Sequence, residues 1–154
     1  MEINQKVANF TLQTDEDKTV NLTDFTGKAV VLFFYPKADT PGCTIEACGF
    51  RDSFEKLIKA GTVVLGISRD TPQSQAKFRA KYNLPYTLLA DVDEKVCNQF
   101  SVLKEKNMYG KKVFGIERTT FLIGPDQKLL HIFPNVKPEG HAEEVLAILK
   151  EHKL

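Results

Sequence analysis

Two cysteines five residues apart, Cys43 and Cys48, stand in the part of the chain that best fits nucleophilic chemistry. The thiolate is the nucleophilic form of cysteine, and a free thiol with a pKa of about 8.5 is mostly neutral at pH 7. Thr40 is a suitable N-cap and Pro41 suits the first helical position, which predicts Cys43 at the third residue of a helix. Backbone N–H groups without intrahelical partners and the positive end of the helix dipole favour the anion there. The hydroxyl of Thr40 is placed to donate one more hydrogen bond to the sulfur.

The charged residues around Cys43 have opposite effects on its thiolate. Glu46 lies three residues further on, and a nearby carboxylate disfavours the anion. A cation must offset Glu46 if the thiolate is used. Arg118 is the best candidate at long range, and Lys37 and Arg51 are local candidates.

The spacing of the two cysteines limits how they could pair. On an intact helix, residues five apart have Cα atoms about 8.7 Å apart, from a rise of about 1.5 Å and a turn of about 100° per residue. A disulfide rarely tolerates more than about 7 Å. Cys43 and Cys48 therefore either never pair, or this helix opens locally in every cycle. Two unrelated, inert helix cysteines are the alternative reading.

The segment with both cysteines lies between two predicted strands. Residues 29–35 are continuously apolar and rich in valine and phenylalanine, which predicts a strand buried on both faces and ended by Pro36. Apolar residues at helical spacing predict a helix over 40–60, and 62–68 is a second buried strand. This βαβ unit places Cys43 at the carboxyl end of a central strand, where open α/β sheets carry their sites.

The rest of the chain predicts a mixed sheet covered by helices. Residues 10–12 and 19–22 read as an N-terminal hairpin. The remaining predicted elements are a helix over 72–82, a strand over 86–90, a short helix over 94–100, a hairpin of 119–123 with 128–133, and a terminal helix from residue 139. The expected fold is α/β, with a central mixed sheet flanked by helices, as in the thioredoxin-like class among other small α/β folds.

Length and composition predict one ordinary globular domain over residues 1–154. The formal net charge is +1, from 21 basic and 20 acidic residues without long blocks of one sign, so neither nucleic acid nor an anionic membrane is expected as a partner. The first residues lack the apolar stretch of a signal peptide, and the longest apolar run, 29–35, is too short to cross a bilayer. A cytoplasmic location is expected, where cysteines serve more often as catalytic, metal-binding or inert thiols than in structural disulfides.

The third cysteine and the histidines give weaker signals. Cys97 stands among apolar residues of a short predicted helix, which favours a place in the core, with a reserve resolving role as the alternative. His131, His141 and His152 are scattered and share no ligand spacing, so packing or surface roles fit them better than metal binding.

The residues around Cys43 resemble the peroxiredoxin family, and in particular its bacterioferritin-comigratory, or Q-type, branch. The matching motifs are Phe34-Tyr35-Pro36-Lys37, Thr40-Pro41-Gly42-Cys43-Thr44 with Glu46 and Cys48, Gly66-Ile67-Ser68, Tyr86-Thr87-Leu88-Leu89-Ala90-Asp91, and Arg118-Thr119-Thr120-Phe121-Leu122-Ile123. The likeness covers nearly the whole chain. It implies a single thioredoxin-like domain with an N-terminal hairpin.

The resemblance also implies roles for the site residues. Cys43 would be the peroxidatic cysteine, with Thr40 and Arg118 as its activating partners. The substrate pocket would be walled by Pro36, Pro41 and Gly42. Cys48 falls where this branch carries its resolving cysteine when it has one.

The implied activity is the reduction of hydrogen peroxide and organic hydroperoxides. Cys43 would become a sulfenic acid, Cys48 would condense with it to a disulfide, and thioredoxin or a similar dithiol would restore both thiols. The cycle needs no metal or organic cofactor, and members of this branch are usually monomers.

Two other functions compete with this one. A disulfide oxidoreductase would favour a Cys-x-x-Cys pair, which this chain lacks. A peroxide sensor would use the same first step but pass the oxidation to a partner protein. A metal-binding module is disfavoured because the two cysteines lack nearby histidine or further cysteine ligands.

Overall fold

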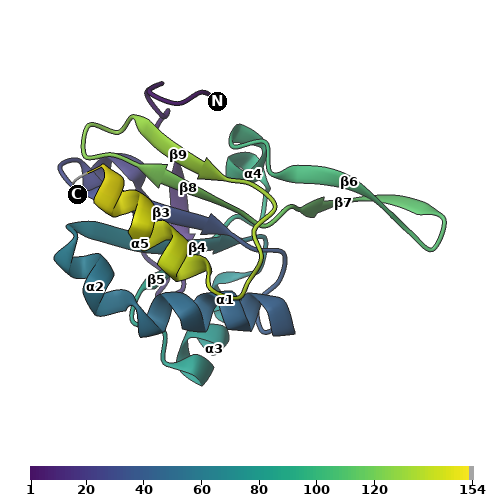
Figure 1. Cartoon of the computed structure of the whole chain (residues 1–154). Coiled ribbons are helices and arrows are strands. Elements are labelled where there is room, and N and C mark those ends of the chain that lie inside the picture. The colour runs from purple at the N-terminus through teal and green to yellow at the C-terminus, as the bar shows by residue number, and fades with distance from the viewer. Residues whose placement is uncertain (153–154) are drawn as a thin grey trace.

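The fold is a seven-stranded mixed sheet with helices on both faces (Figure 1), seen in a computed structural model that describes residues 1–152. The strand order is β2-β1-β5-β4-β3-β8-β9. The elements are β1 (Thr11–Thr14), β2 (Thr19–Asn21), η1 (Leu22–Phe25), β3 (Ala29–Phe34), α1 (Pro41–Asp52), α2 (Phe54–Lys59), β4 (Thr62–Ser68), α3 (Pro72–Tyr82), β5 (Thr87–Ala90), α4 (Lys95–Gln99), β6 (Leu103–Met108), β7 (Lys111–Ile116), β8 (Thr119–Ile123), β9 (Leu129–Phe133) and α5 (His141–Glu151).

The most apolar strand, β3, lies at the centre of this sheet. All six of its residues are buried, and it pairs parallel with β4 and antiparallel with β8. Its alternate side chains serve two cores: Val30, Leu32 and Phe34 point to one face, and Val31 and Phe33 to the other. The predictions of a buried strand, a βαβ unit, an N-terminal hairpin and a late hairpin are confirmed.

The single helix predicted over 40–60 is wrong, because it is two helices that meet at Ser53. That residue has φ −100° and ψ 7°. Ser53 is still hydrogen-bonded to both helices, from Ser53 N to Gly49 O at 3.1 Å and from Leu57 N to Ser53 O at 3.1 Å. The chain therefore bends without unwinding. Apolar residues keep their helical spacing through a bend, and for this reason the sequence pattern did not reveal it.

A two-stranded arm, made of β6 and β7, projects from the body and was not predicted (Figure 1). Most of its residues are exposed, so no buried face imposes the alternation of apolar and polar residues that marks a strand. The turn at its tip is made by Tyr109 and Gly110, whose φ values of 54° and 79° suit a tight hairpin turn. Within residues 1–152, no helix is both long and apolar enough to span a membrane.

Candidate active site

The first turn of α1 holds Cys43 as the sequence predicts. Thr40 has the extended backbone of an N-cap, Pro41 is the first helical residue, and Cys43 is the third. The sulfur-bearing side chain is buried at 1% exposure. The Thr40 hydroxyl does not cap the helix or reach the sulfur. It donates to Lys37 O at 2.8 Å, which tightens the loop before the helix.

Arg118 is the cation that reaches Cys43 from a distant part of the sequence. It directly precedes β8, whose first residue Thr119 pairs with Phe34 at the end of β3. Strand pairing thus carries Arg118 to the sheet edge where α1 begins. Its Nη1 donates to Cys43 Sγ at 3.4 Å and to Glu46 Oε1 at 2.8 Å. The Arg118 side chain is only 15% exposed, so it is not a surface charge on a strand edge.

Glu46 is the buried acid of this cluster. Burial raises its pKa to about 7, against the opposing effect of the Arg118 charge and hydrogen bond. Its second oxygen, Oε2, has no hydrogen-bond partner among the described residues. The two local candidates for its cation do not reach it: Lys37 is exposed, and Arg51 donates to Asp52 Oδ1 and to a backbone carbonyl of α3.

A buried hydrogen-bond chain fixes the loop between β3 and α1. Asp70 Oδ2 accepts from Ala38 N at 2.8 Å and from Ser68 Oγ at 2.6 Å. Gln75 Nε2 donates to Ser68 Oγ at 2.9 Å, and Tyr35 donates its hydroxyl to Gln75 Oε1. The chain runs from β3 through α3 and β4 to the loop. Sequence analysis missed these residues, because such a contact leaves no local pattern.

The three residues expected to wall the pocket lie in different places. Pro36 and Arg118 line a pocket of roughly 470 Å³ together with residues of β6, β7 and the loop after β9. Gly42 lies against the cation: a Cβ at that position would be 3.0 Å from Arg118 Nη2 and 3.4 Å from Pro138 Cγ. Pro41 is exposed on the first helical turn. Pro36 and Gly42 thus adjoin Arg118, whereas Pro41 mainly starts the helix.

Cys48 lies on the same helix as Cys43 and is partly exposed, and both thiols are free. The helix between them is wound, so their Cα atoms are about 8.7 Å apart, beyond disulfide reach. Tyr86 Oη donates to Ala47 O at 2.6 Å in this buried stretch. Pairing of the two cysteines requires the helix to unwind and this bond to break.

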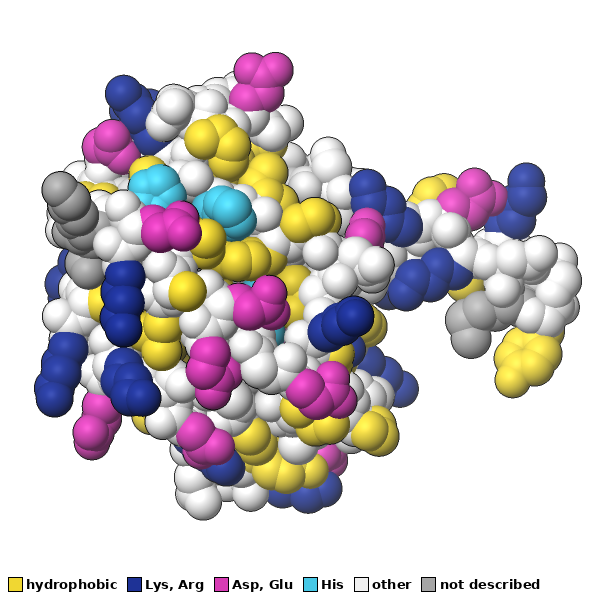
Figure 2. All heavy atoms as spheres, viewed as in Figure 1, with side chains coloured by type: hydrophobic (Ala, Val, Ile, Leu, Met, Phe, Trp, Pro, Cys, Tyr) yellow, Lys and Arg dark blue, Asp and Glu magenta, His cyan; other side chains and the backbone are white. Residues whose placement is uncertain are grey.

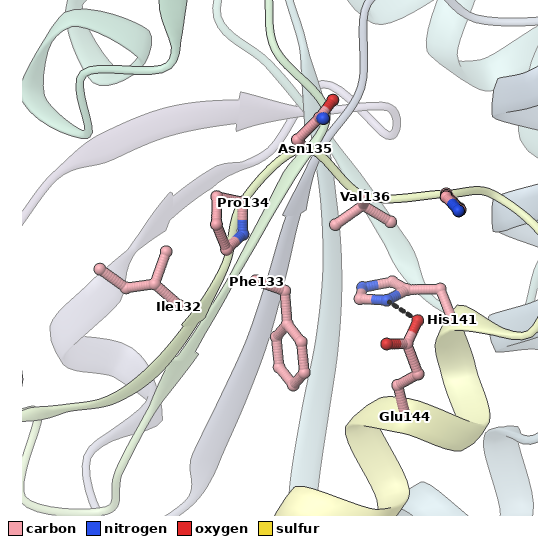
Figure 3. Close-up of a pocket in the computed structure, with 8 residues that line it drawn as sticks. Ile132, Phe133, Pro134, Asn135, Val136, His141 and Glu144 are labelled. Atoms are coloured by element: carbon pink, nitrogen blue, oxygen red, sulfur yellow. Dashed lines mark hydrogen bonds and ion pairs between the residues drawn. The ribbon is translucent and has the colours of Figure 1, made fainter.

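A second pocket lies beside the site, between the end of β9 and the start of α5 (Figure 3). His141 points into it, with Nδ1 3.4 Å from Glu144 Oε1 and Nε2 2.7 Å from Thr120 Oγ1. Burial lowers the pKa of His141, against the opposing effect of Glu144. The packing role expected for this histidine is confirmed. The adjoining loop holds the active-site arginine in place, since Val136 N donates to Arg118 O at 2.8 Å.

No cluster of metal-binding side chains occurs within the described part of the chain. Cys97 is fully buried in the core, as expected. Burial raises the pKa of its thiol, and a hydrogen bond with Asp91 raises it further. Cys97 is therefore held as a neutral, shielded thiol.

A buried cysteine at a helix start, beside an arginine and at the carboxyl end of a central strand, defines a thiol-based redox protein on a sheet-and-helix scaffold. Arg118 places a positive charge beside the sulfur, and its N–H groups can donate hydrogen bonds to an oxygen bound next to it. Similarity to known proteins shows which family within this class the chain belongs to. A model of the AhpC/TSA family matches residues 3–132.

Similar proteins of known kind agree with that match. A putative peroxiredoxin from Coxiella burnetii is 54% identical over 149 residues, which cover 97% of this chain and 99% of that protein. The peroxiredoxin Bcp of Escherichia coli is 50% identical over 143 residues, 93% of this chain and 92% of that protein. A structure of the bacterioferritin comigratory protein of Xanthomonas campestris, solved in a study of its alkyl peroxide reduction activity, superposes with a TM-score of 0.91. It is 42% identical and covers 94% of this chain and 92% of its own.

The chain belongs to the AhpC/TSA family and is a peroxiredoxin of the Bcp and PrxQ kind. The resemblance to the peroxiredoxin family and the thioredoxin-like fold class are thereby confirmed.

Proposed function

We propose that Cys43 is the peroxidatic cysteine of this peroxiredoxin and that Arg118 activates both the thiolate and the peroxide. The carrying observation is the position of Arg118 Nη1, 3.4 Å from Cys43 Sγ. A positive donor at this distance favours the thiolate over the thiol. The same guanidinium has five N–H groups in a fixed fork, so it can hold the sulfur and still donate to a peroxide oxygen.

The first step transfers one oxygen to sulfur. The Cys43 thiolate attacks the terminal oxygen of the hydroperoxide, an S–O bond forms, and the O–O bond breaks. The products are a sulfenic acid and an alkoxide or hydroxide, which takes up a proton and leaves as an alcohol or water. Arg118 stabilises the negative charge that develops on the leaving oxygen. Thr40, whose hydroxyl here donates to Lys37 O, would turn that hydroxyl to the bound peroxide.

The second step closes a disulfide on the same helix. The Cys48 thiolate attacks the sulfenic sulfur of Cys43, an S–S bond forms and the S–O bond breaks, and the hydroxide that leaves takes up a proton to become water. Because the wound helix holds the two residues apart, the turns between them must open first. A thioredoxin-type dithiol then gives two electrons and two protons, and becomes a disulfide itself. We place this cycle in the cytoplasm, where such dithiols are kept reduced, and in a monomer, since both cysteines lie on one chain.

The substrates proposed are hydrogen peroxide and organic hydroperoxides. The relative from Xanthomonas campestris is described in connection with alkyl peroxide reduction. In this chain, the pocket of roughly 470 Å³ next to Arg118 offers room for an alkyl group.

The test is one equivalent of hydrogen peroxide added to the reduced protein, followed by intact mass and peptide mapping. We expect a loss of two mass units and a Cys43–Cys48 link. Cys48→Ser should gain one oxygen and stop there, and Cys43→Ser should leave peroxide unconsumed. Unchanged thiols in the unsubstituted protein after seconds of exposure would refute the proposal. Sustained NADPH oxidation with thioredoxin and its reductase separates an enzyme from a sensor, which would react once and stop.

A further inference from the structure

The arm formed by β6 and β7 presents two unlike faces. In the register of the hairpin, Lys104 pairs with Gly115, Lys106 with Val113, and Met108 with Lys111. Side chains alternate between the faces of a hairpin, so Lys104, Lys106 and Lys111 share one face. We call this side, with Val113 and Gly115, the basic face. The Lys106 side chain lies along Gly115, with its Nζ 3.5 Å from where a Cβ would be.

The opposite face of the arm is electrically neutral. Glu105 and Lys112 share it and form an ion pair at 3.6 Å. On the basic face, Lys104 lies 4.0 Å from Glu117, whereas Lys106 and Lys111 pair with no acid among residues 1–152. The arm thus concentrates positive charge on one face of a chain whose formal net charge is only +1. Figure 2 shows lysine side chains standing along the projecting arm.

The basic face begins at the mouth of the active site. Lys104 and Lys106 line the same pocket as Pro36 and Arg118, and Arg118 contacts the Cys43 sulfur. In Figure 1 the arm leaves the body on the side where α1 begins. The base of the arm is tied to the body, because Arg69 Nη1 donates to Phe114 O at 3.1 Å. The lysines therefore stand at a set position above the site.

We propose that the basic face is the docking surface for the dithiol reductant, and that this reductant carries acidic side chains around its thiols. The inference rests on the proposed function, in which a protein dithiol must reach the Cys43–Cys48 disulfide. From Lys104 to Lys111 the charges extend over about 14 Å of strand, at about 3.4 Å per residue. A small peroxide at Cys43 cannot span that length, whereas a protein surface can.

The charges on the basic face would mainly raise the rate at which the reductant associates with this chain. Opposite charges at the rim of an interface steer the encounter, and this steering weakens as salt screens it. An exposed apolar side chain on the same face, Val113 at 38%, can add contact area once the partner has arrived. Peroxide reduction itself needs neither feature.

The experiment compares Lys111→Glu with Lys112→Glu, because Lys111 lies on the basic face but outside the pocket beside Arg118. Both variants change the net charge by the same amount on the same exposed hairpin, but on opposite faces. The probe is a thioredoxin of net negative charge, kept reduced by its reductase and NADPH, and the readout is kcat/KM for thioredoxin at several salt concentrations. Two further readouts are the rate of Cys43 oxidation by hydrogen peroxide and recycling by dithiothreitol, a small uncharged dithiol.

We expect Lys111→Glu to lower kcat/KM for thioredoxin by about three- to tenfold at low salt and to flatten its salt dependence, as a reversed rim charge does. Lys112→Glu should stay within about twofold of the unsubstituted protein on the same argument. Oxidation by peroxide and recycling by dithiothreitol should be unchanged in both variants.

Equal losses in the two variants would overturn the inference, since total charge and not the basic face would then matter. A loss in Lys111→Glu that appears with anionic hydroperoxides and not with thioredoxin would also overturn it, and would assign the lysine to substrate. Neither result touches the proposed function, which fails only if peroxide leaves the thiols of the unsubstituted protein intact.

Discussion

The guanidinium of Arg118 joins Cys43 to Glu46: one nitrogen, Nη1, lies 3.4 Å from the sulfur and 2.8 Å from Glu46 Oε1. The acid holds the arginine in place, and the arginine faces the thiol. Glu46 also sits between the two cysteines on the helix that must open. In the proposed cycle, the residue that orients the cation during oxidation would therefore be exposed to water during the resolving step.

Arg118→Lys should lower the rate of Cys43 oxidation by about 10²- to 10³-fold, the usual effect of removing a donor aimed at developing negative charge. Lysine keeps the charge but has no planar fork, so it cannot hold the sulfur, Glu46 and a peroxide together. The measurement is rapid quenching with a thiol-blocking reagent and intact mass. A rate within threefold of the unsubstituted protein would remove Arg118 from the mechanism.

The rate of disulfide formation should change with pH as Glu46 ionises. Its pKa is about 7 in the wound helix and has an ordinary value of 4.5. The wound form therefore binds the proton more tightly. Its extra stability is fully present below pH 4.5 and is lost as the pH rises to about 7. Unwinding should become easier across this range, by about tenfold for each pH unit over which the opened helix has released the Glu46 proton and the wound helix still binds it.

Glu46→Gln isolates that effect, because glutamine cannot ionise. The ratio of resolving rates, unsubstituted over Glu46→Gln, should rise between pH 4.5 and 7 and be flat above. Taking the ratio removes the pH effects that both proteins share. The resolving rate is read from the decay of the sulfenic acid mass into the disulfide mass. A constant ratio across the range would show that Glu46 does not control unwinding.

Much of the fold was predictable because helices and strands that pack on a core repeat apolar residues at a spacing set by their geometry. The apolar run of β3 and the helical spacing of α3 both reflect packing against a core. The β6–β7 arm is mostly exposed, so no burial pattern marked its two strands in the sequence. The bend at Ser53 keeps the apolar residues at helical spacing, so the sequence pattern did not reveal it.

The site was predictable where its chemistry is local. The start of α1 places Cys43 by capping rules alone. Arg118 is 75 residues from Cys43 in the sequence. The alternation of side chains along a strand predicts which face of the sheet Arg118 is on, but not which residues it contacts. The bonds of Asp70 to the active-site loop and of Tyr86 to α1 join distant segments through the finished fold. Only the packed structure reveals such contacts.

Gly42→Ala should separate activity from stability. A Cβ there would lie 3.0 Å from Arg118 Nη2, so the flexible end of the arginine must move away from Cys43. We expect oxidation to slow by about tenfold, as when a catalytic donor is displaced without being lost. The free energy of unfolding should hold or rise, because alanine favours a helix over glycine by about 1 kcal/mol.

Gly49→Ala is the matched control on the same helix. A Cβ at Gly49 would meet Ala142 Cβ at 4.0 Å, an ordinary contact. Its unfolding free energy should rise while the oxidation rate stays unchanged. Equal slowing of oxidation in both variants would mean that helix stiffness, and not the place of Arg118, sets the rate.

Tyr86→Phe should speed disulfide formation. The Tyr86 hydroxyl donates to Ala47 O at 2.6 Å, and Ala47 lies between the two cysteines. This bond must break when the helix opens, and a typical net hydrogen bond contributes about 1 kcal/mol. Its removal should raise the resolving rate about fivefold, by the same free energy.

The oxidation step separates this effect from general loosening of the site. Oxidation of Cys43 takes place in the wound helix, so Tyr86→Phe should leave that rate unchanged. Global stability should fall by about 1 kcal/mol, since the same bond is lost on unfolding. Both rates come from one quench series, as the gain of one oxygen and its later conversion to the disulfide. A resolving rate that stays the same or falls would mean that unwinding is not limited by the Tyr86 bond.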